Sequence, residues 1–248
     1  MKTHARSVII GGGAMGVGLL YHLAKEGWKD VVLVEKGELT SGSTWHAAGL
    51  IPHFIGSLNM AKIHFYGADL YKKLEEETGQ ATGWHGCGAI RLALDQDQVD
   101  WFHYVKGVLD QVGAECHLLG PDEIRKVHPL LETDGFLMGA YTTGDGHTDP
   151  SGATQAMAVG ARNRGAEIYL NNRVTDTKLL PSGEWEVITE KGTIICEHLV
   201  NAAGSFCEQV GMMAGIKVPM VNMVHQYLMT ETIPEVAALE KELPVVRD

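Results

Sequence analysis

Short apolar runs and helix-period segments alternate along the first part of the chain. Residues 7–10 and 31–34 are apolar runs of strand length. Between them, Met15, Leu19 and Leu23 recur at the spacing of one helix face, and Gly27 is typical of a helix end. A strand, a helix and a second strand within about 30 residues predict a βαβ unit on a buried parallel sheet.

The same reading extends to the rest of the chain. We predict helices over 58–78, 98–112, 121–129 and 149–163, strands over 89–93, 167–170, 174–179, 198–202 and 221–229, and a hairpin over 185–196. The closely spaced strands of the second half favour antiparallel pairing. The predicted fold class is therefore α/β, with a Rossmann-like domain and a smaller antiparallel-sheet region.

Composition excludes several classes of protein. The chain has 248 residues, of which 45% are hydrophobic and 21% charged, as in an ordinary globular protein of one or two domains. Its net charge of −11 argues against a nucleic-acid partner. No apolar run reaches the roughly 18 residues of a membrane span. The N-terminus lacks a targeting segment, so we expect a cytoplasmic protein with reduced thiols. With no CxxC or HExxH motif among four cysteines and twelve histidines, we predict no metal site.

A glycine motif follows the first predicted strand. Gly11, Gly13 and Gly16 form a GxGxxG pattern between that strand and the next helix. Glycines at this spacing permit a tight turn, a close backbone approach to a pyrophosphate and close packing of helix on strand. The helix N-terminus attracts phosphates, and Glu35, at the end of the second strand, is suited to ribose hydroxyls. The motif predicts dinucleotide binding but does not separate NAD from FAD.

The segment 39–50 is rich in small and hydroxyl-bearing residues that can lie along an extended cofactor. Its Ser-Thr-Trp-His-Ala-Ala-Gly run (43–49) resembles the dimethylglycine and sarcosine dehydrogenase family of D-amino-acid-oxidase-like flavoproteins. Residues 71–79, 88–93 and 200–204 resemble the same proteins. Family members continue well past Asp248, and residues 243–248 are an apolar run that stops abruptly, so we expect a C-terminally truncated chain.

The resemblance implies FAD as the cofactor, bonded covalently to His46. A hydrogen-bonded loop histidine is the alternative for that residue, and we expect Trp45 to pack beside the flavin. The expected cofactor-binding residues are Gly11, Gly13, Ala14, Met15, Gly16, Glu35, Lys36, Gly42, Ser43, Thr44, Trp45, His46, Ala47, Ala48, Gly49, Leu50, Val174 and Gly204.

The activity implied by the resemblance is oxidation of an N-methyl amino acid such as dimethylglycine or sarcosine. Hydride passes from the N-methyl carbon to flavin N5, and the resulting iminium releases formaldehyde or transfers its carbon to tetrahydrofolate if a folate domain is present. His225 is the candidate catalytic residue, because an imidazole can keep the substrate amine deprotonated; a histidine on a strand surface is the alternative. Arg91 could bind a substrate carboxylate or form a surface salt bridge. The electron acceptor would be an electron-transfer flavoprotein or oxygen.

Three other interpretations stay open. The enzyme could oxidise another secondary amine or a D-amino acid, the chain could be a non-catalytic flavin-binding regulatory relative, or it could be an inert fragment. We expect the FAD-binding domain at 1–85 and 148–220 and an incomplete substrate-binding region at 86–147 and 221–248.

Overall fold

The computed structural model describes residues 1–247, which form two compact units. The first unit comprises Met1–Ala48, Leu74–Thr82 and Asp149–His225, and the second comprises Gly49–Lys73, Gly83–Thr148 and Gln226–Asp248. Residues 49–73 therefore group with the second unit rather than with the region 1–85. None of the described helices has both the length and the apolar character needed to cross a membrane.

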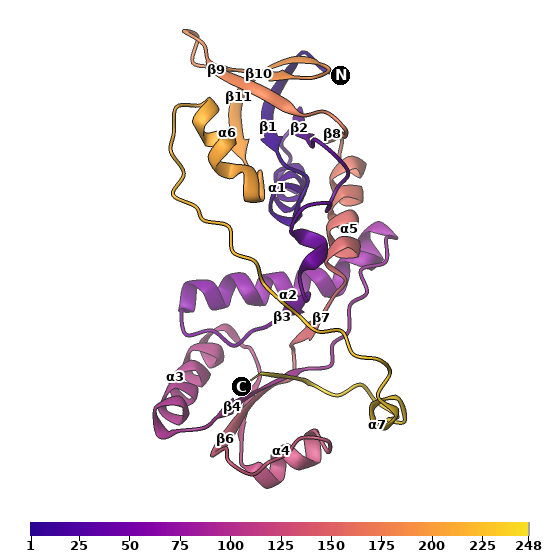
Figure 1. Ribbon diagram of the computed structural model, residues 1–248, viewed down its shortest axis with the longest axis vertical. Helices are drawn as coiled ribbons and strands as arrows, with labels where there is room; N and C mark the ends of the chain where they lie inside the picture. Colours follow the sequence, from indigo (N-terminus) through magenta and orange to yellow (C-terminus); the bar gives the residue numbers. More distant parts are fainter. Residues whose placement is uncertain (248) are drawn as a thin grey trace. The chain divides into compact units, whose positions relative to one another are not determined.

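A six-stranded sheet forms the centre of the first unit (Figure 1). In spatial order its strands are β8 (Glu167–Tyr169), β2 (Val31–Val34), β1 (His4–Ile10), β11 (Gly192–Asn201), β10 (Trp185–Thr189) and β9 (Val174–Leu179). The first four are parallel, and the last two pair antiparallel as a hairpin extension of β11. The predicted βαβ unit, the hairpin near Gly192 and the mixed α/β class are confirmed.

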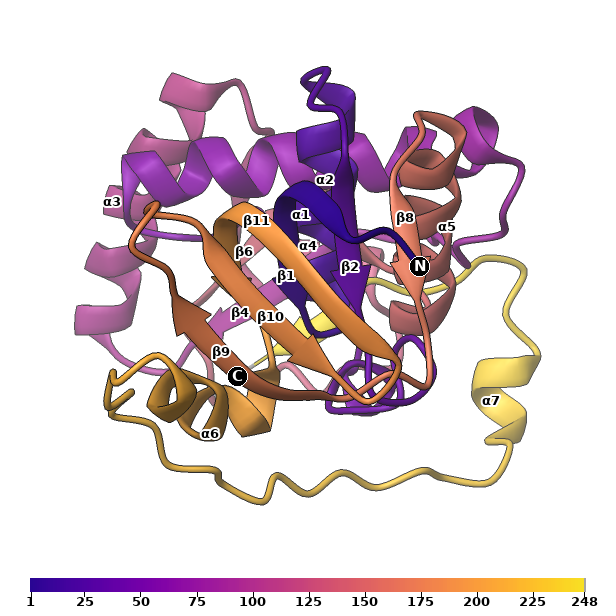
Figure 2. The same ribbon diagram turned by 90° about the horizontal axis from the view of Figure 1, so that it is seen from above.

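Helices cover both faces of this sheet because its strands are apolar on both sides. Helices α1 (Ala14–Lys25) and α5 (Pro150–Asn163) lie on one face, and α6 (Cys207–Met213) lies on the other (Figure 2). Val8, Ile10 and Val34 pack in one buried cluster with Val210 of α6. Alternate strand residues point to the opposite face. The parallel strands are thus buried on both sides, as their continuous apolar runs predicted.

The start of α5 is set by its own sequence. The side chain of Asp149 accepts hydrogen bonds from the backbone N–H groups of Ser151 and Gly152, at 3.0 and 2.9 Å. Pro150 occupies the first helical position, where no N–H is needed. The helix predicted over 149–163 thus starts from a cap at Asp149.

The second unit contains a four-stranded sheet and a separate two-stranded ladder. The sheet order is β12 (Val245–Arg247), β4 (Ala89–Ala93), β6 (Met138–Thr142) and β5 (Cys116–Leu119), and the ladder pairs β3 (Leu50–Ile51) with β7 (Gly146–His147). Its helices are α3 (Gln96–Val112), α4 (Pro121–Val127), α7 (Pro234–Ala237) and the part of α2 (Leu58–Thr78) up to Lys73. Phe102, Val105 and Leu109 of α3 pack with Ala93 and Ala140 in a buried cluster.

The strand predicted over 221–229 is wrong. These residues have no regular secondary structure, and Val221, Met223 and Val224 are each at least 87% exposed. Alternating apolar residues form a strand only where a neighbouring strand accepts their backbone hydrogen bonds, and no described strand pairs with this segment. Strands β3, β5, β6 and β7 were not predicted.

Candidate functional site

The glycine turn between β1 and α1 is closely packed on all sides. Gly11 has a φ of +117°, a conformation that side chains disfavour, and a Cβ there would lie 2.3 Å from the carbonyl oxygen of Ala202. A Cβ on Gly16 would lie 2.0 Å from the carbonyl oxygen of Gly11. The two glycines therefore let β1, α1 and the end of β11 approach at backbone distance.

The N-terminus of α1 is open to a ligand. Gly13 is its N-cap residue and has no side chain to bind the first N–H groups of the helix. Thr44 Oγ1 accepts a hydrogen bond from the N–H of Ala14 at 3.0 Å, and Met15 is 81% exposed. The N–H groups of a helix's first turn lack intrahelical acceptors and carry the positive end of its dipole, which suits a phosphate.

Glu35 is held at the end of β2 by backbone donors. Its Oε2 accepts a hydrogen bond from the N–H of Gly12 at 2.6 Å, and its Oε1 accepts one from Gly37 at 2.8 Å. The residue is only 9% exposed. Each carboxylate oxygen can accept a second hydrogen bond, so a fixed acceptor pair remains for the hydroxyls of a sugar.

A cavity of about 550 Å³ in the first unit brings these features together. It is lined by Gly11, Gly12, Gly13, Ala14, Met15, Glu35, Lys36, Ser41, Gly42, Ser43, Thr44, His46, Ala202, Ala203, Gly204, Ser205 and Phe206. Most of the expected cofactor-binding residues are thus neighbours. Gly16, Trp45, Ala47 and Ala48 are not in the lining, and Gly49 and Leu50 belong to the second unit.

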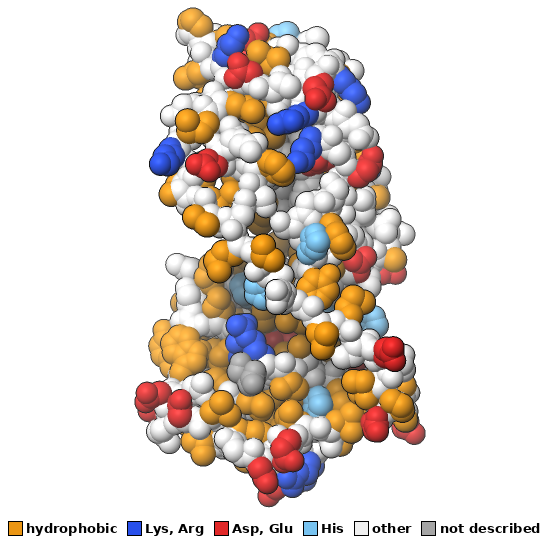
Figure 3. All heavy atoms as spheres, viewed as in Figure 1, with side chains coloured by type: hydrophobic (Ala, Val, Ile, Leu, Met, Phe, Trp, Pro, Cys, Tyr) orange, Lys and Arg blue, Asp and Glu red, His pale blue; other side chains and the backbone are white. Residues whose placement is uncertain are grey.

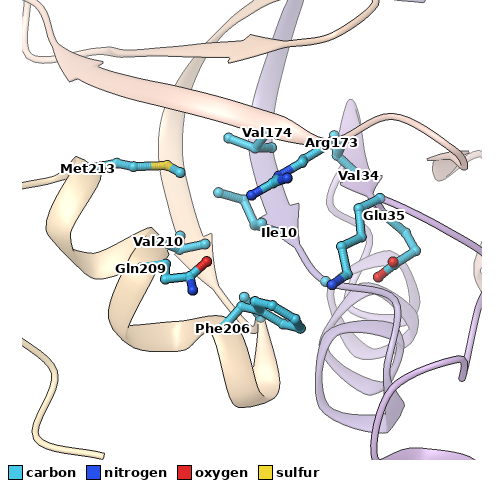
Figure 4. Close-up of a pocket in the computed structure, with 12 residues that line it drawn as sticks. Ile10, Val34, Glu35, Arg173, Val174, Phe206, Gln209, Val210 and Met213 are labelled. Carbon is cyan, nitrogen blue, oxygen red and sulfur yellow. The ribbon is translucent and has the colours of Figure 1, made fainter.

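A smaller and mainly apolar cavity of about 120 Å³ adjoins the first (Figure 4). The two cavities share five lining residues, Gly11, Glu35, Lys36, Ala203 and Phe206. Val174 lines the smaller one, facing the α6 residues Val210 and Met213. Together the two cavities form what we call the dinucleotide groove. Along it lie the apolar slot beside Val174, the carboxylate of Glu35 and the N-terminus of α1, in that order.

His46 lies in the large cavity of the dinucleotide groove. It ends the short 3-10 helix Thr44–His46, and its side chain is exposed. The His46 ring centroid is 3.7 Å from that of Trp45. The same short helix therefore provides both the Thr44 contact to α1 and an accessible imidazole.

His225 is the last residue of the first unit and is exposed in the segment without secondary structure. It lines neither cavity of the dinucleotide groove. Three residues earlier, the side-chain amide of Asn222 donates a hydrogen bond to the carbonyl oxygen of Ser205 at 3.2 Å. This contact ties the segment to the rim of the groove.

Phe206 and Arg173 are among the groove's side chains that sequence reasoning missed. Lys36 Nζ lies 3.3 Å from the ring centroid of Phe206, an aromatic residue two positions after Gly204. Arg173, directly before Val174, also lines the apolar slot. Nothing in the local pattern marks them, because only the fold brings the start of β9 and the end of β11 beside β2.

The second unit has a cavity of its own, of about 110 Å³, with a mainly apolar lining that includes three charged residues. Arg91 and Arg247 line it, in register on β4 and β12, and burial together with the charge of Arg247 lowers the pKa of Arg91. Asp145 also lines it, but its carboxylate already binds His53 at 2.6 Å and Thr142 at 2.5 Å. No described carboxylate forms a salt bridge with Arg91, so the cavity offers positive charge to an anion.

Basic and acidic side chains are interspersed on the face that Figure 3 shows, without a broad basic area. A nucleic-acid surface has such an area. The described surface on this face therefore agrees with the acidic net charge of the chain.

We expect Glu35→Gln to weaken binding of the dinucleotide, for which FAD is the one implied by the resemblance, about tenfold. An amide has one acceptor oxygen, so either Gly12 or Gly37 would lose its buried partner, at a cost of about 1–3 kcal/mol. Fluorescence titration with FAD measures the change. The control is Glu38→Gln, since the Glu38 side chain is exposed and accepts a hydrogen bond from the side-chain amide of Asn171 at 2.8 Å. Equal dissociation constants for the two variants would contradict this role of Glu35.

Comparison with known proteins adds independent evidence. A model of the FAD dependent oxidoreductase (DAO) family matches residues 6–248. The chain is 48% identical over its whole length to rat dimethylglycine dehydrogenase and 36% identical to human sarcosine dehydrogenase, of which it spans 29% and 27%. The crystal structure of L-proline dehydrogenase from P. horikoshii is similar with a TM-score of 0.81 and 29% identity, over 88% of this chain and 57% of that one.

Proposed function

Because this chain belongs to the FAD dependent oxidoreductase (DAO) family, we propose that it binds FAD and oxidises an N-methyl amino acid such as dimethylglycine or sarcosine. The observation that carries the proposal is the dinucleotide groove with His46 in its large cavity. The similarity to dimethylglycine and sarcosine dehydrogenases supports the choice of substrate class.

The residues of the groove fit FAD part by part. The apolar slot beside Val174 suits an adenine ring, and the fixed carboxylate of Glu35 suits ribose hydroxyls. The first turn of α1 suits the pyrophosphate. A Cβ at Gly11 would collide with Ala202, which shows how closely backbone surrounds the turn. When bound, FAD supplies an acceptor for the hydride that leaves the N-methyl carbon.

We assign covalent attachment to the imidazole of His46. Its ring nitrogen would hold the flavin through a bond to the 8α-methyl carbon, in exchange for one hydrogen from each partner. This net loss of two electrons and two protons would require molecular oxygen or another electron acceptor. The exposure of His46 in the cavity supports this role.

We assign substrate recognition to the cavity of the second unit that Arg91 and Arg247 line, and we call it the arginine cavity. Arg91 and Arg247 are both cationic and line one small cavity, so a carboxylate there would relieve the repulsion between two neighbouring guanidinium groups. Asp145 forms hydrogen bonds with His53 and Thr142 and no salt bridge with Arg91, although its charge acts on Arg91 across the cavity. This arrangement suits an amino-acid substrate better than an uncharged amine.

We assign to His225 the role of accepting a proton from the substrate amine. A neutral imidazole that accepts this proton leaves the nitrogen lone pair free, and loss of hydride from the adjacent carbon requires that lone pair. The anchoring of its segment to the rim of the dinucleotide groove through Asn222 supports the assignment.

The test is anaerobic titration of the FAD-loaded chain, followed by the visible absorbance of the flavin. We expect dimethylglycine or sarcosine to bleach the flavin and D-alanine to leave it oxidised. Arg91→Met should raise the substrate concentration needed by about tenfold or more, because a charge-assisted pair is lost. Arg125→Met is the control, since Arg125 lies on α4 and does not line the arginine cavity.

The other outcomes contradict the proposal in different ways. Bleaching by D-alanine alone would indicate a D-amino-acid oxidoreductase. Bound FAD that no amine bleaches would indicate a non-catalytic flavin-binding relative. A chain that binds no FAD would contradict the assignment of the dinucleotide groove itself.

A further inference from the structure

Two histidines of the second unit are held side by side by backbone hydrogen bonds. His85 and His147 form an antiparallel bridge, with N–H to carbonyl distances of 2.8 and 3.0 Å. His147 also belongs to β7, which pairs with β3. A Cβ on Gly146 would lie 2.0 Å from the carbonyl oxygen of His85, so the glycine is needed for this approach. The imidazole rings stack with centroids 4.8 Å apart and planes 9° from parallel.

A carboxylate from a distant part of the chain joins the two rings. Glu242 Oε2 lies 2.7 Å from His85 Nδ1, and its Oε1 lies 2.6 Å from His147 Nε2. The hydrogen bond to His147 is the main cause that lowers the pKa of Glu242, so its carboxylate is charged. The three side chains are exposed or half-buried and therefore accessible from solvent.

We propose that His85, His147 and Glu242 form a binding site for a divalent transition-metal ion, with Zn²⁺ as the reference ion. One ligand atom from each residue lies within 4.8 Å of the others. Two imidazole nitrogens and one carboxylate oxygen are a donor set that Zn²⁺ accepts, with a water molecule in the fourth position. The site is independent of the dinucleotide groove and of the amine-oxidation proposal.

Metal binding requires a local rearrangement of the three side chains. Zinc bonds of about 2.0–2.1 Å in a tetrahedron place ligand atoms roughly 3.3 Å apart. The two hydrogen-bonded pairs would therefore open by roughly 0.6–0.7 Å, and ligand atoms that are now up to 4.8 Å apart would close by up to about 1.5 Å, through rotation of the exposed side chains. The Cys87 thiol is not assigned as a ligand, because it is not in the cluster of ligand atoms that lie within 4.8 Å of one another, and its Sγ contacts the carbonyl oxygen of Gly88 at 3.5 Å.

Metal binding would fasten the segment 226–247 to the rest of the second unit. The two histidines are fixed by the bridge, whereas Glu242 follows the exposed segment 226–233 and the short helix α7. Beyond Glu242, the segment is held by β12, which pairs with β4. The ion would add a second point of attachment at Glu242, which precedes β12 in the sequence. Arg247 of the arginine cavity lies on that strand.

Isothermal titration of the full chain with Zn²⁺ tests the proposal. We expect one ion per chain, and Co²⁺ in its place should give the absorption bands of a four-coordinate site. His147→Ala and Glu242→Gln should each weaken Zn²⁺ binding about a hundredfold. Loss of a residue that only supports a metal ligand already weakens binding by about 10–100-fold, and these two residues are the ligands themselves. His117→Ala is the matched control, because His117 pairs with Glu115 at 2.9 Å without a second histidine. Circular dichroism verifies that each variant is folded.

Limited trypsin digestion gives a second readout. Lys241 adjoins Glu242, so Zn²⁺ should slow cleavage after Lys241 in the unsubstituted chain but not in Glu242→Gln. Cleavage after Lys217, outside the fastened segment, should be unchanged and serves as an internal reference. Failure to bind Zn²⁺, or binding that both His147→Ala and Glu242→Gln leave unchanged, would overturn the site.

Discussion

Replacement of His46 by alanine is expected to abolish covalent flavin attachment while leaving reversible FAD binding largely intact. His46 is the histidine in the lining of the dinucleotide groove, and alanine has no nitrogen to form the bond. The other contacts come from Glu35, the first turn of α1 and the apolar slot, none of which depends on the imidazole. The expected change in attachment is all or none.

Acid precipitation of the FAD-loaded chain separates the two forms of binding. Flavin should stay in the pellet of the unsubstituted chain, whose intact mass should exceed that of the polypeptide by one FAD. With His46→Ala the flavin should move to the supernatant. His198→Ala is the matched control, because His198 is also exposed in the first unit but lies outside the groove. Flavin that remains bound to precipitated His46→Ala would place the attachment elsewhere.

Gly16→Ala and Gly18→Ala are expected to have opposite effects on stability, although both add one methyl group to α1. At Gly16 the new Cβ would lie 2.0 Å from the carbonyl oxygen of Gly11, which is backbone and cannot rotate away. At Gly18 the nearest atom is the sulfur of Met157, at an ordinary 3.9 Å. We expect Gly16→Ala to lower the free energy of unfolding by about 1–3 kcal/mol. Gly18→Ala should raise it by about 0.5–1 kcal/mol, through helix propensity alone.

The same pair of variants should differ in FAD affinity. Displacing the first turn of α1 moves the N–H groups that face the pyrophosphate, so we expect Gly16→Ala to bind FAD about tenfold more weakly, equivalent to about 1.4 kcal/mol. Urea denaturation and fluorescence titration measure the two effects. If both variants had the same stability and affinity, close packing at Gly16 would not be what the turn requires.

Local sequence pattern predicted the elements that are long or carry their own signals. The helix over 58–78 and the strand over 89–93 have the predicted bounds, and Asp149 caps the predicted α5. These elements depend on periodicity and on capping side chains, which act within a few residues. The segment 221–229 shows the limit of this reasoning, because its alternating pattern contains no information about a pairing partner.

The candidate sites divide in the same way. The GxGxxG turn, Glu35 and the run that contains His46 are visible in the sequence, because close backbone approach and a strand-end carboxylate each require particular residues locally. The roles of Phe206 and Arg173 in the groove were not visible, and neither was the cluster of His85, His147 and Glu242.

The sequence by itself determined that this protein has a parallel α/β unit with a dinucleotide-binding turn, since apolar periodicity and glycine spacing act over short stretches of chain. Only the tertiary structure decided which side chains meet from distant segments. His147 and Glu242 are 95 residues apart, yet they lie within hydrogen-bonding distance. Their meeting depends on the backbone bridge at His85 and on the path of the chain towards β12, and no local pattern encodes either.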